Sequence, residues 1–248
     1  MQIIVNNLAV TYELAGKGKT VVLLHGWGDN YHTFDQLVSD LKNDYQVLAF
    51  DLPGFGSSQA PPKAWDLDNY AVLTAALQDK LELKAYALIG HSNGGALAIC
   101  GLSSGILKSD KLVLLASAGI RNSQPVKRLA TKVVAKVGKM STYWLPSETR
   151  QNLRRKLYGT VGSDMLVMPE LSETFKRTVA QDVQADAARL KLPTLIINAD
   201  QDPAIALSDG KLYHSLIKGS RLEVLHSNSH FIHQENFAQV AKIIKSFL

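Results

Sequence analysis

The sequence predicts an α/β protein with a mostly parallel central sheet, flanked by helices, and a helical lid inserted between two strands. Three observations predict this fold. Short β-branched or aliphatic runs alternate with longer segments of helical period, which is typical of parallel strands joined by crossover helices. The run at 21–24 is apolar at every position, as expected for a strand covered on both faces. Between residues 121 and 192 no strand-like run appears and helical patterns dominate.

The expected strands are short segments rich in β-branched or aliphatic residues. In chain order, the strands are expected at residues 10–14, 21–24, 45–50, 85–89, 111–116, 194–198 and 221–225. Two helices are predicted from their apolar spacing, which repeats at three and four residues. The first carries Phe34, Leu37, Val38 and Leu41, and the second carries Tyr70, Leu73, Leu77 and Leu81. Asp66 or Asp68 is the expected N-cap of the second helix. Two further helices are expected at 96–102 and 237–247.

Composition and length indicate one globular core with an insertion. Of the 248 residues, 46% are hydrophobic and 20% are charged, which is ordinary for a soluble globular protein. We expect a core formed by residues 1–120 and 193–248 and a lid formed by 121–192. The single cysteine, Cys100, excludes an intramolecular disulfide and a cysteine-based zinc cluster. The chain shows no apolar run long enough for a spanning helix and no signal-peptide pattern at its start, so a cytoplasmic location is expected.

Positive charge is concentrated in the expected lid. Residues 121–163 carry ten lysines and arginines against one acid, Glu148, whereas the net charge of the whole chain is +5. A protein that wraps nucleic acid is usually basic over more of its surface. We therefore expect no nucleic-acid partner.

A candidate nucleophile stands at the end of the strand expected at 85–89. The sequence Gly90-His-Ser-Asn-Gly-Gly95 fits Gly-x-Ser-x-Gly, and a strand precedes it while a helix follows. In such a turn the serine backbone is strained and the hydroxyl projects outward, so Ser92 is the predicted nucleophile. The flanking glycines leave no Cβ to collide across the turn.

Acyl transfer also needs two N–H groups that donate to the developing oxyanion. The residue after the nucleophile, Asn93, is expected to supply one. The loop after the strand at 21–24 contains His25-Gly-Trp-Gly28 and is expected to supply the second from Trp27. The alternative for Trp27 is a packing role only, and both roles are compatible because the donor is a backbone group.

A serine hydroxyl becomes a nucleophile when a histidine takes its proton and a carboxylate orients that histidine. Of the seven histidines, His25 and His91 are expected to support the glycine-rich loops, and His32 and His214 to lie in helical segments at the surface. His226, His230 and His233 follow the last strand. We predict His230 as the catalytic base, with His226 abutting the strand end and His233 facing away in an incipient helix.

The expected carboxylate lies after the strand at 194–198. Asp202 is predicted because it stands out on the loop, where Pro203 keeps the chain extended. Asp200 is the alternative. The chain order Ser92, Asp202, His230 is the one expected for this arrangement on a doubly wound sheet.

Taken together, these segments resemble the α/β-hydrolase fold family, over essentially the whole chain. The matching segments are His25-Gly-Trp-Gly28, Asp51-Leu-Pro-Gly-Phe-Gly-Ser-Ser58, Gly90-His-Ser-Asn-Gly-Gly95, Asp202 after a strand, and Ser229-His-Phe231. The resemblance implies that the segment starting at Asp51 forms a loop beside the active site. Asp51 is therefore expected to be structural.

The same resemblance narrows the reaction. Haloalkane dehalogenases and epoxide hydrolases of this fold use aspartate at the nucleophile position, where this chain has Ser92. Proline iminopeptidases bind a free amine through acidic lid residues, whereas this lid is basic. The expected function is a carboxylesterase that works through an acyl-enzyme, with no cofactor and no metal. Two alternatives stay open. One is a carbon–carbon hydrolase of ring-cleavage products, which typically has tryptophan where this chain has Phe231. The other is a ligand receptor with residual hydrolase activity.

The lid is expected to determine the substrate. Apolar residues that are candidates for the pocket are Trp27, Met140, Tyr143, Trp144, Met165, Met168 and Phe231; those of the lid have core packing as their alternative role. The basic face of the lid is expected to be solvated. The sharper hypotheses are that it docks an acidic carrier protein or an anionic membrane surface. The first is suggested by a resemblance to carboxylesterases that cleave methyl esters from acyl-carrier proteins.

Overall fold

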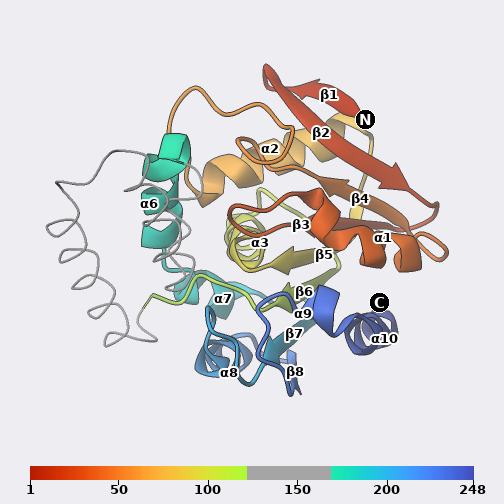
Figure 1. Ribbon diagram of the computed structural model, residues 1–248, viewed down its shortest axis with the longest axis vertical. Helices are drawn as coiled ribbons and strands as arrows, with labels where there is room; N and C mark the ends of the chain where they lie inside the picture. Colours follow the sequence, from red (N-terminus) through yellow and green to blue (C-terminus); the bar gives the residue numbers. More distant parts are fainter. Residues whose placement is uncertain (122–168) are drawn as a thin grey trace, which may run out of the picture.

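The computed structural model describes residues 1–121 and 169–248 of the chain (Figure 1). An eight-stranded sheet crosses it in the order β1-β2-β4-β3-β5-β6-β7-β8. The strands are β1 (Gln2–Val5), β2 (Leu8–Ala15), β3 (Thr20–Leu24), β4 (Gln46–Phe50), β5 (Ala85–His91), β6 (Lys111–Leu115), β7 (Thr194–Ala199) and β8 (Arg221–Leu225). β1 with β2 and β2 with β4 are antiparallel, and every other neighbouring pair is parallel. The predicted mostly parallel sheet is therefore confirmed.

Helices cover both faces of the sheet (Figure 1). They are α1 (Asp35–Leu41), α2 (Leu67–Lys80), α3 (Asn93–Ser103), α6 (Ser172–Ala180), α7 (Gln184–Arg189), α8 (Leu207–Leu216), α9 (Ile232–Glu235) and α10 (Phe237–Phe247), with two 3-10 turns, η1 (Tyr31–Phe34) and η3 (Pro169–Leu171). α1 and α10 pack on one face, and α2, α3, α7 and α8 pack on the other. In the described residues no helix is long and apolar enough to cross a membrane.

Alternate residues of the central strands supply the two halves of the core. In β3, Val21 and Leu23 pack with α1 and α10, whereas Val22 and Leu24 pack with α2 and α3. Successive side chains of a strand point to opposite faces, so a strand buried on both faces must be apolar throughout. This is why the continuous apolar run at 21–24 correctly predicted a central strand.

Three details of the elements confirm the prediction, differ from it or decide between its alternatives. β1 was not predicted, because four residues at an edge that is partly exposed leave little apolar pattern. Asp66, and not Asp68, caps α2: its carboxylate accepts from the Asn69 N–H at 3.0 Å, and the Asn69 side chain accepts from the Asp66 N–H. α3 begins directly after Ser92, as predicted for the turn, and continues through the run expected at 96–102.

Between β6 and β7, the described part of the insertion is helical. α6 packs beside the loop that follows β4, where Thr174 Oγ1 accepts from the Trp65 N–H at 3.1 Å and Gln181 Oε1 accepts from the Leu67 N–H at 2.7 Å. α7 packs against α3 and α8 of the core. The division into a core of 1–120 and 193–248 and a lid of 121–192 stays a proposal.

Candidate active site

The turn between β5 and α3 holds Ser92 in a strained backbone conformation. Its φ is +50° and its ψ is −117°, a combination that costs a residue other than glycine about 1–3 kcal/mol. Hydrogen bonds to β6 and to the segment after it hold the turn: the Ser92 N–H donates to the Leu115 carbonyl at 3.0 Å, and the Ser92 carbonyl accepts from the Ala118 N–H at 3.0 Å. This strand–turn–helix geometry is the one expected of a nucleophile elbow.

Close backbone packing explains the two glycines of the motif. A Cβ on Gly90 would lie 2.5 Å from the carbonyl oxygen of Gly94, and a Cβ on Gly94 would lie 2.1 Å from that of Leu24. Both atoms belong to the backbone and cannot swing aside. The Gly-x-Ser-x-Gly spacing therefore reflects how tightly this turn packs on itself and on β3.

The predicted oxyanion donors lie on the two segments that meet at Ser92. Asn93 is the first residue of α3, where N–H groups lack a partner within the helix and lie at the positive end of its dipole. The loop after β3 also reaches this point, because a Cβ on Gly26 would lie 3.2 Å from Cβ of Ser92. Trp27 follows Gly26 directly. Its indole packs edge-on against Phe55, at 4.9 Å between ring centroids.

The structure brings the predicted histidine and carboxylate together. Nδ1 of His230 donates to Oδ2 of Asp202 at 2.8 Å, and both side chains are largely buried. The other carboxylate oxygen, Oδ1, accepts from the backbone N–H groups of Ala204 at 2.7 Å and Ile205 at 2.9 Å. Because Nδ1 carries the proton toward Asp202, a neutral His230 has Nε2 as its unprotonated nitrogen. That is the tautomer that a general base needs.

His230 lies beside the end of the strand that carries Ser92. Its ring centroid is 4.7 Å from that of His91, the last residue of β5, and its carbonyl oxygen is 3.1 Å from Nε2 of His91. The candidate base, its carboxylate and the candidate nucleophile therefore gather at the carboxyl ends of β5, β7 and β8. In doubly wound folds, ligands bind at this edge of the sheet.

The alternative carboxylate has a different partner. Oδ2 of Asp200 accepts from Nδ1 of His226 at 2.7 Å, and Oδ1 accepts from the Ser227 N–H at 3.0 Å. These hydrogen bonds, that of His226 first, lower the pKa of Asp200 below its ordinary value. His226 is exposed to solvent. Asp200 is thus engaged at the surface, away from His230.

Two residues that the sequence predicted to be structural, His25 and Asp51, do stabilise loops. His25 is buried: its Nδ1 donates to the Gly26 carbonyl at 2.7 Å, and its Nε2 accepts from the Leu52 N–H at 2.9 Å. Burial, the largest effect, lowers the pKa of His25, so the ring is neutral at pH 7. Asp51 accepts from the N–H groups of Tyr31 and Ser57, both at 2.8 Å. Together they join the loop after β3 to the loop after β4.

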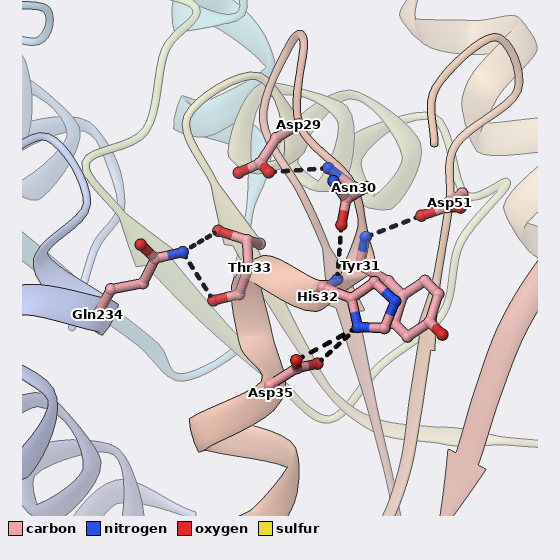
Figure 2. Close-up of polar contacts among 8 residues, drawn as sticks. All are labelled: Asp29, Asn30, Tyr31, His32, Thr33, Asp35, Asp51 and Gln234. Carbon is pink, nitrogen blue, oxygen red and sulfur yellow. Dashed lines mark hydrogen bonds and ion pairs between the residues drawn. The ribbon is translucent and has the colours of Figure 1, made fainter. Parts of the chain in front are cut away.

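Figure 2 shows how polar groups hold the loop after β3. Asn30 caps η1, because its side-chain oxygen accepts from the His32 N–H at 3.0 Å. The amide of Gln234, in α9, donates to Thr33 twice, to its hydroxyl at 2.8 Å and to its carbonyl at 3.2 Å. This loop is therefore tied directly to the segment that follows His230.

One prediction about this segment is wrong. His233 does not face away: it is buried, its Nε2 is hydrogen-bonded to the Thr33 hydroxyl at 3.0 Å, and its ring lies 4.5 Å from that of His91. The sequence offered no signal for this, because the contact joins residues 200 positions apart. The exposed positions of His32 and His214 agree with the prediction.

Two of the candidate pocket residues lie in the described part of the chain. Phe231 is 38% exposed, and its ring lies 5.6 Å from that of His230. Trp27 is partly buried and also contacts Phe175 of α6, at 5.0 Å between ring centroids. The remaining candidates lie outside the described residues, namely Met140, Tyr143, Trp144, Met165 and Met168. Within residues 1–121 and 169–248, no group of three or more His, Cys, Asp and Glu side chains is arranged to hold a metal ion.

Comparisons with known proteins agree with this fold. Residues 21–243 match the model of the alpha/beta hydrolase family. The pimeloyl-[acyl-carrier protein] methyl ester esterase of Neisseria meningitidis is 30% identical over 239 residues, which is 89% of this chain and 74% of that protein. An esterase of Exiguobacterium antarcticum has a TM-score of 0.75 at 21% identity, over 99% of this chain and 98% of the other.

A meta-cleavage product hydrolase of Pseudomonas fluorescens has a TM-score of 0.76 at 22% identity, over 100% of this chain and 96% of the other. At such identities the two solved structures show a shared fold and leave the reaction open.

Proposed function

The chain belongs to the alpha/beta hydrolase family, and we propose that it hydrolyses carboxylic esters through an acyl-enzyme formed on Ser92. The observation that carries this proposal is the buried hydrogen bond between His230 and Asp202, next to the strained turn of Ser92. A hydrogen-bonded base oriented by a carboxylate, beside an elbow serine, is the arrangement that activates a hydroxyl for attack on a carbonyl.

In the proposed reaction His230 first acts as a base. Nε2 takes the proton of the Ser92 hydroxyl as Oγ attacks the ester carbonyl carbon. The carbonyl oxygen becomes an oxyanion that accepts hydrogen bonds from the N–H groups of Trp27 and Asn93. The ester C–O bond then breaks, and protonated His230 gives its proton to the departing alcohol oxygen.

Water completes the cycle. His230 takes a proton from water, the resulting hydroxide attacks the acyl carbon, and the bond to Ser92 Oγ breaks. The proton returns from His230 to Ser92 Oγ, so that one ester and one water yield one acid and one alcohol. Asp202 stays ionised throughout and stabilises the imidazolium that forms in each half.

The finer proposal concerns the substrate. The relative at 30% identity is named as a methyl ester esterase that acts on an acyl group attached to an acyl-carrier protein. This name, together with the basic segment 121–163, makes methyl esters of acyl chains on an acidic carrier the first substrates to test. The segment lies almost entirely outside the described residues, so the support is the sequence and the likeness alone.

The test uses covalent labelling and turnover together. A fluorophosphonate probe should add its mass to Ser92, and a panel of p-nitrophenyl and methyl esters, varied in acyl length and offered free or on a carrier protein, should be turned over. Ser92→Ala should abolish both signals, whereas Ser215→Ala, an exposed serine of α8, should keep both. Wild-type protein that behaves like Ser92→Ala in both assays would exclude the proposal.

The same panel separates the alternatives. A receptor would bind a ligand tightly and complete few turnovers. A carbon–carbon hydrolase would leave the esters uncleaved and would hydrolyse a ring-cleavage product instead.

A further inference from the structure

The side chain of His91 has no part in the mechanism above, yet it lies where three loops of the site meet. It is buried at the end of β5, one residue before Ser92. On one side, a Cβ on Gly26 of the loop after β3 would lie 3.1 Å from its Nδ1. On the other side, its ring lies 4.7 Å from that of His230 and 5.2 Å from that of Phe231.

Hydrogen bonding defines which nitrogen of His91 carries the proton. Nε2 lies 3.1 Å from the His230 carbonyl oxygen, which can only accept, so Nε2 is the donor. Nδ1 is buried without a hydrogen-bond partner. A second proton there would be a buried, unpaired donor on a charged ring. Burial, followed by the nearby His233 and His230, lowers the pKa of His91 well below its ordinary value. The ring is thus a neutral donor and does not compete with His230 for the proton of Ser92.

The ring of His233 packs against the ring of His91. Its ring lies 4.5 Å from that of His91, and its Nε2 is held at 3.0 Å by the Thr33 hydroxyl. Figure 2 shows that Thr33 is itself bound by the amide of Gln234. The loop after β3 is therefore hydrogen-bonded to the segment that follows His230, and His91 packs against both.

We propose that His91 is a positioning residue for His230: its Nε2–H holds the backbone carbonyl of His230 while Asp202 holds the ring. This inference rests on the proposed function. A loop residue such as His230 has freedom in both its backbone and its side-chain torsions, and the hydrogen bond to Asp202 fixes only the ring. The bond from His91 removes the backbone freedom, because β5 is a central strand of the sheet. Small misplacements of a base are enough to slow proton transfer about 100-fold.

The test compares two side chains of equal length. His91→Met removes the donor and fills the same space, whereas His91→Gln keeps an N–H group near the position of Nε2. In His91→Met we expect kcat to fall about 10- to 100-fold with KM within about threefold, and fluorophosphonate labelling of Ser92 to slow by the same factor. His91→Gln should recover to within about threefold of wild type. His226→Gln, which removes an exposed histidine, should behave as wild type.

The outcomes separate positioning from folding and from the proposed function. Thermal unfolding of each variant is measured first, to establish that the variant folds. If His91→Met does not fold, His91→Asn replaces it, because the shorter amide falls short of the carbonyl. Equal activity in the donor-free variant and wild type would overturn the inference, and so would an equal loss in the donor-free and Gln variants. Wild type that neither labels nor turns over esters would instead count against the proposed function.

Discussion

Two histidine–aspartate pairs with similar Nδ1–Oδ2 distances lie on the loops that follow β7 and β8. After β7 and β8, His230 and Asp202 approach to 2.8 Å, and His226 and Asp200 approach to 2.7 Å, both through Nδ1 and Oδ2. Their surroundings differ. The side chains of His230 and Asp202 are 16% and 0% exposed, whereas those of His226 and Asp200 are 85% and 31% exposed.

A short distance alone therefore does not distinguish the proposed catalytic pair from the surface pair. Around His226 and Asp200, water screens the charges, and such exposed pairs contribute little to stability. Around Asp202, the carboxylate is removed from water and is satisfied by two backbone N–H groups as well as by the imidazole. A buried carboxylate of this kind can orient a ring and stabilise its charged form, which an exposed one does poorly.

The largest effect is expected from breaking the buried pair of His230 and Asp202. Asp202→Asn keeps the shape of the side chain but removes its charge, so that it no longer holds His230 in the tautomer with Nε2 unprotonated. We expect kcat for a p-nitrophenyl ester to fall on the order of 10³- to 10⁴-fold. The matched change in the exposed pair, Asp200→Asn, should leave kcat within about twofold. Similar losses in both variants would contradict the contrast drawn from burial.

An intermediate effect concerns stability in acid and compares buried with exposed histidines. Burial lowers the pKa of His25, of His91 and, to about 3, of His233. The unfolded chain protonates these rings near pH 6.5, so below that pH the unfolded state binds more protons and stability falls. Each ring that stays neutral in the folded state removes about 1.4 kcal/mol per pH unit.

Urea unfolding between pH 7 and 4.5 measures this slope. The lowered pKa of Asp200 acts only below its usual value of 3.8, outside this range. His233→Gln should reduce the slope by about 1.4 kcal/mol per pH unit, and the exposed change His226→Gln should not alter it. A stability that is flat over this range would contradict the assignment of neutral, buried rings.

The smallest effect is expected from breaking the exposed pair alone. His226→Gln and the double variant with Asp200→Asn should unfold close to the wild-type temperature at 0.15 M salt, because both partners are solvated. Differential scanning calorimetry at low and high salt checks this. A large loss of Tm, or a salt dependence confined to wild type, would show that the surface pair matters more than its exposure indicates.

Much of the fold was predictable because its signals are local. The uninterrupted apolar runs at 21–24 and 112–115 mark central strands, and the spacing of Phe34, Leu37 and Leu41 marks α1. The motif around Ser92 is also local, since its glycines are required by contacts within one turn and with the strand beside it. β1 escaped prediction because an edge strand of four residues has no complete apolar face.

The sequence distinguished the acidic residues and histidines from one another less clearly than it marked the strands, because their roles depend on tertiary contacts. Asp200 and Asp202 differ by two positions on one loop, and the sequence favoured Asp202 only through its place beside Pro203. What separates them in the structure is burial and partner, which depend on how the loops after β7 and β8 fold over each other. The position of His233 was predicted wrongly for the same reason, because its burial and its partner also depend on tertiary contacts.

By itself, the sequence determined the alternation of strands and helices, the strained serine turn and the order in which the three candidate groups follow one another. These depend on apolar period, glycine positions and chain order, which neighbouring residues impose. Only the tertiary structure decided that His230 pairs with Asp202, that His226 pairs with Asp200, and that the rings of His91 and His233 pack against each other. Those pairings join residues 26 to 142 positions apart, and they are selected by which groups the packed sheet removes from water.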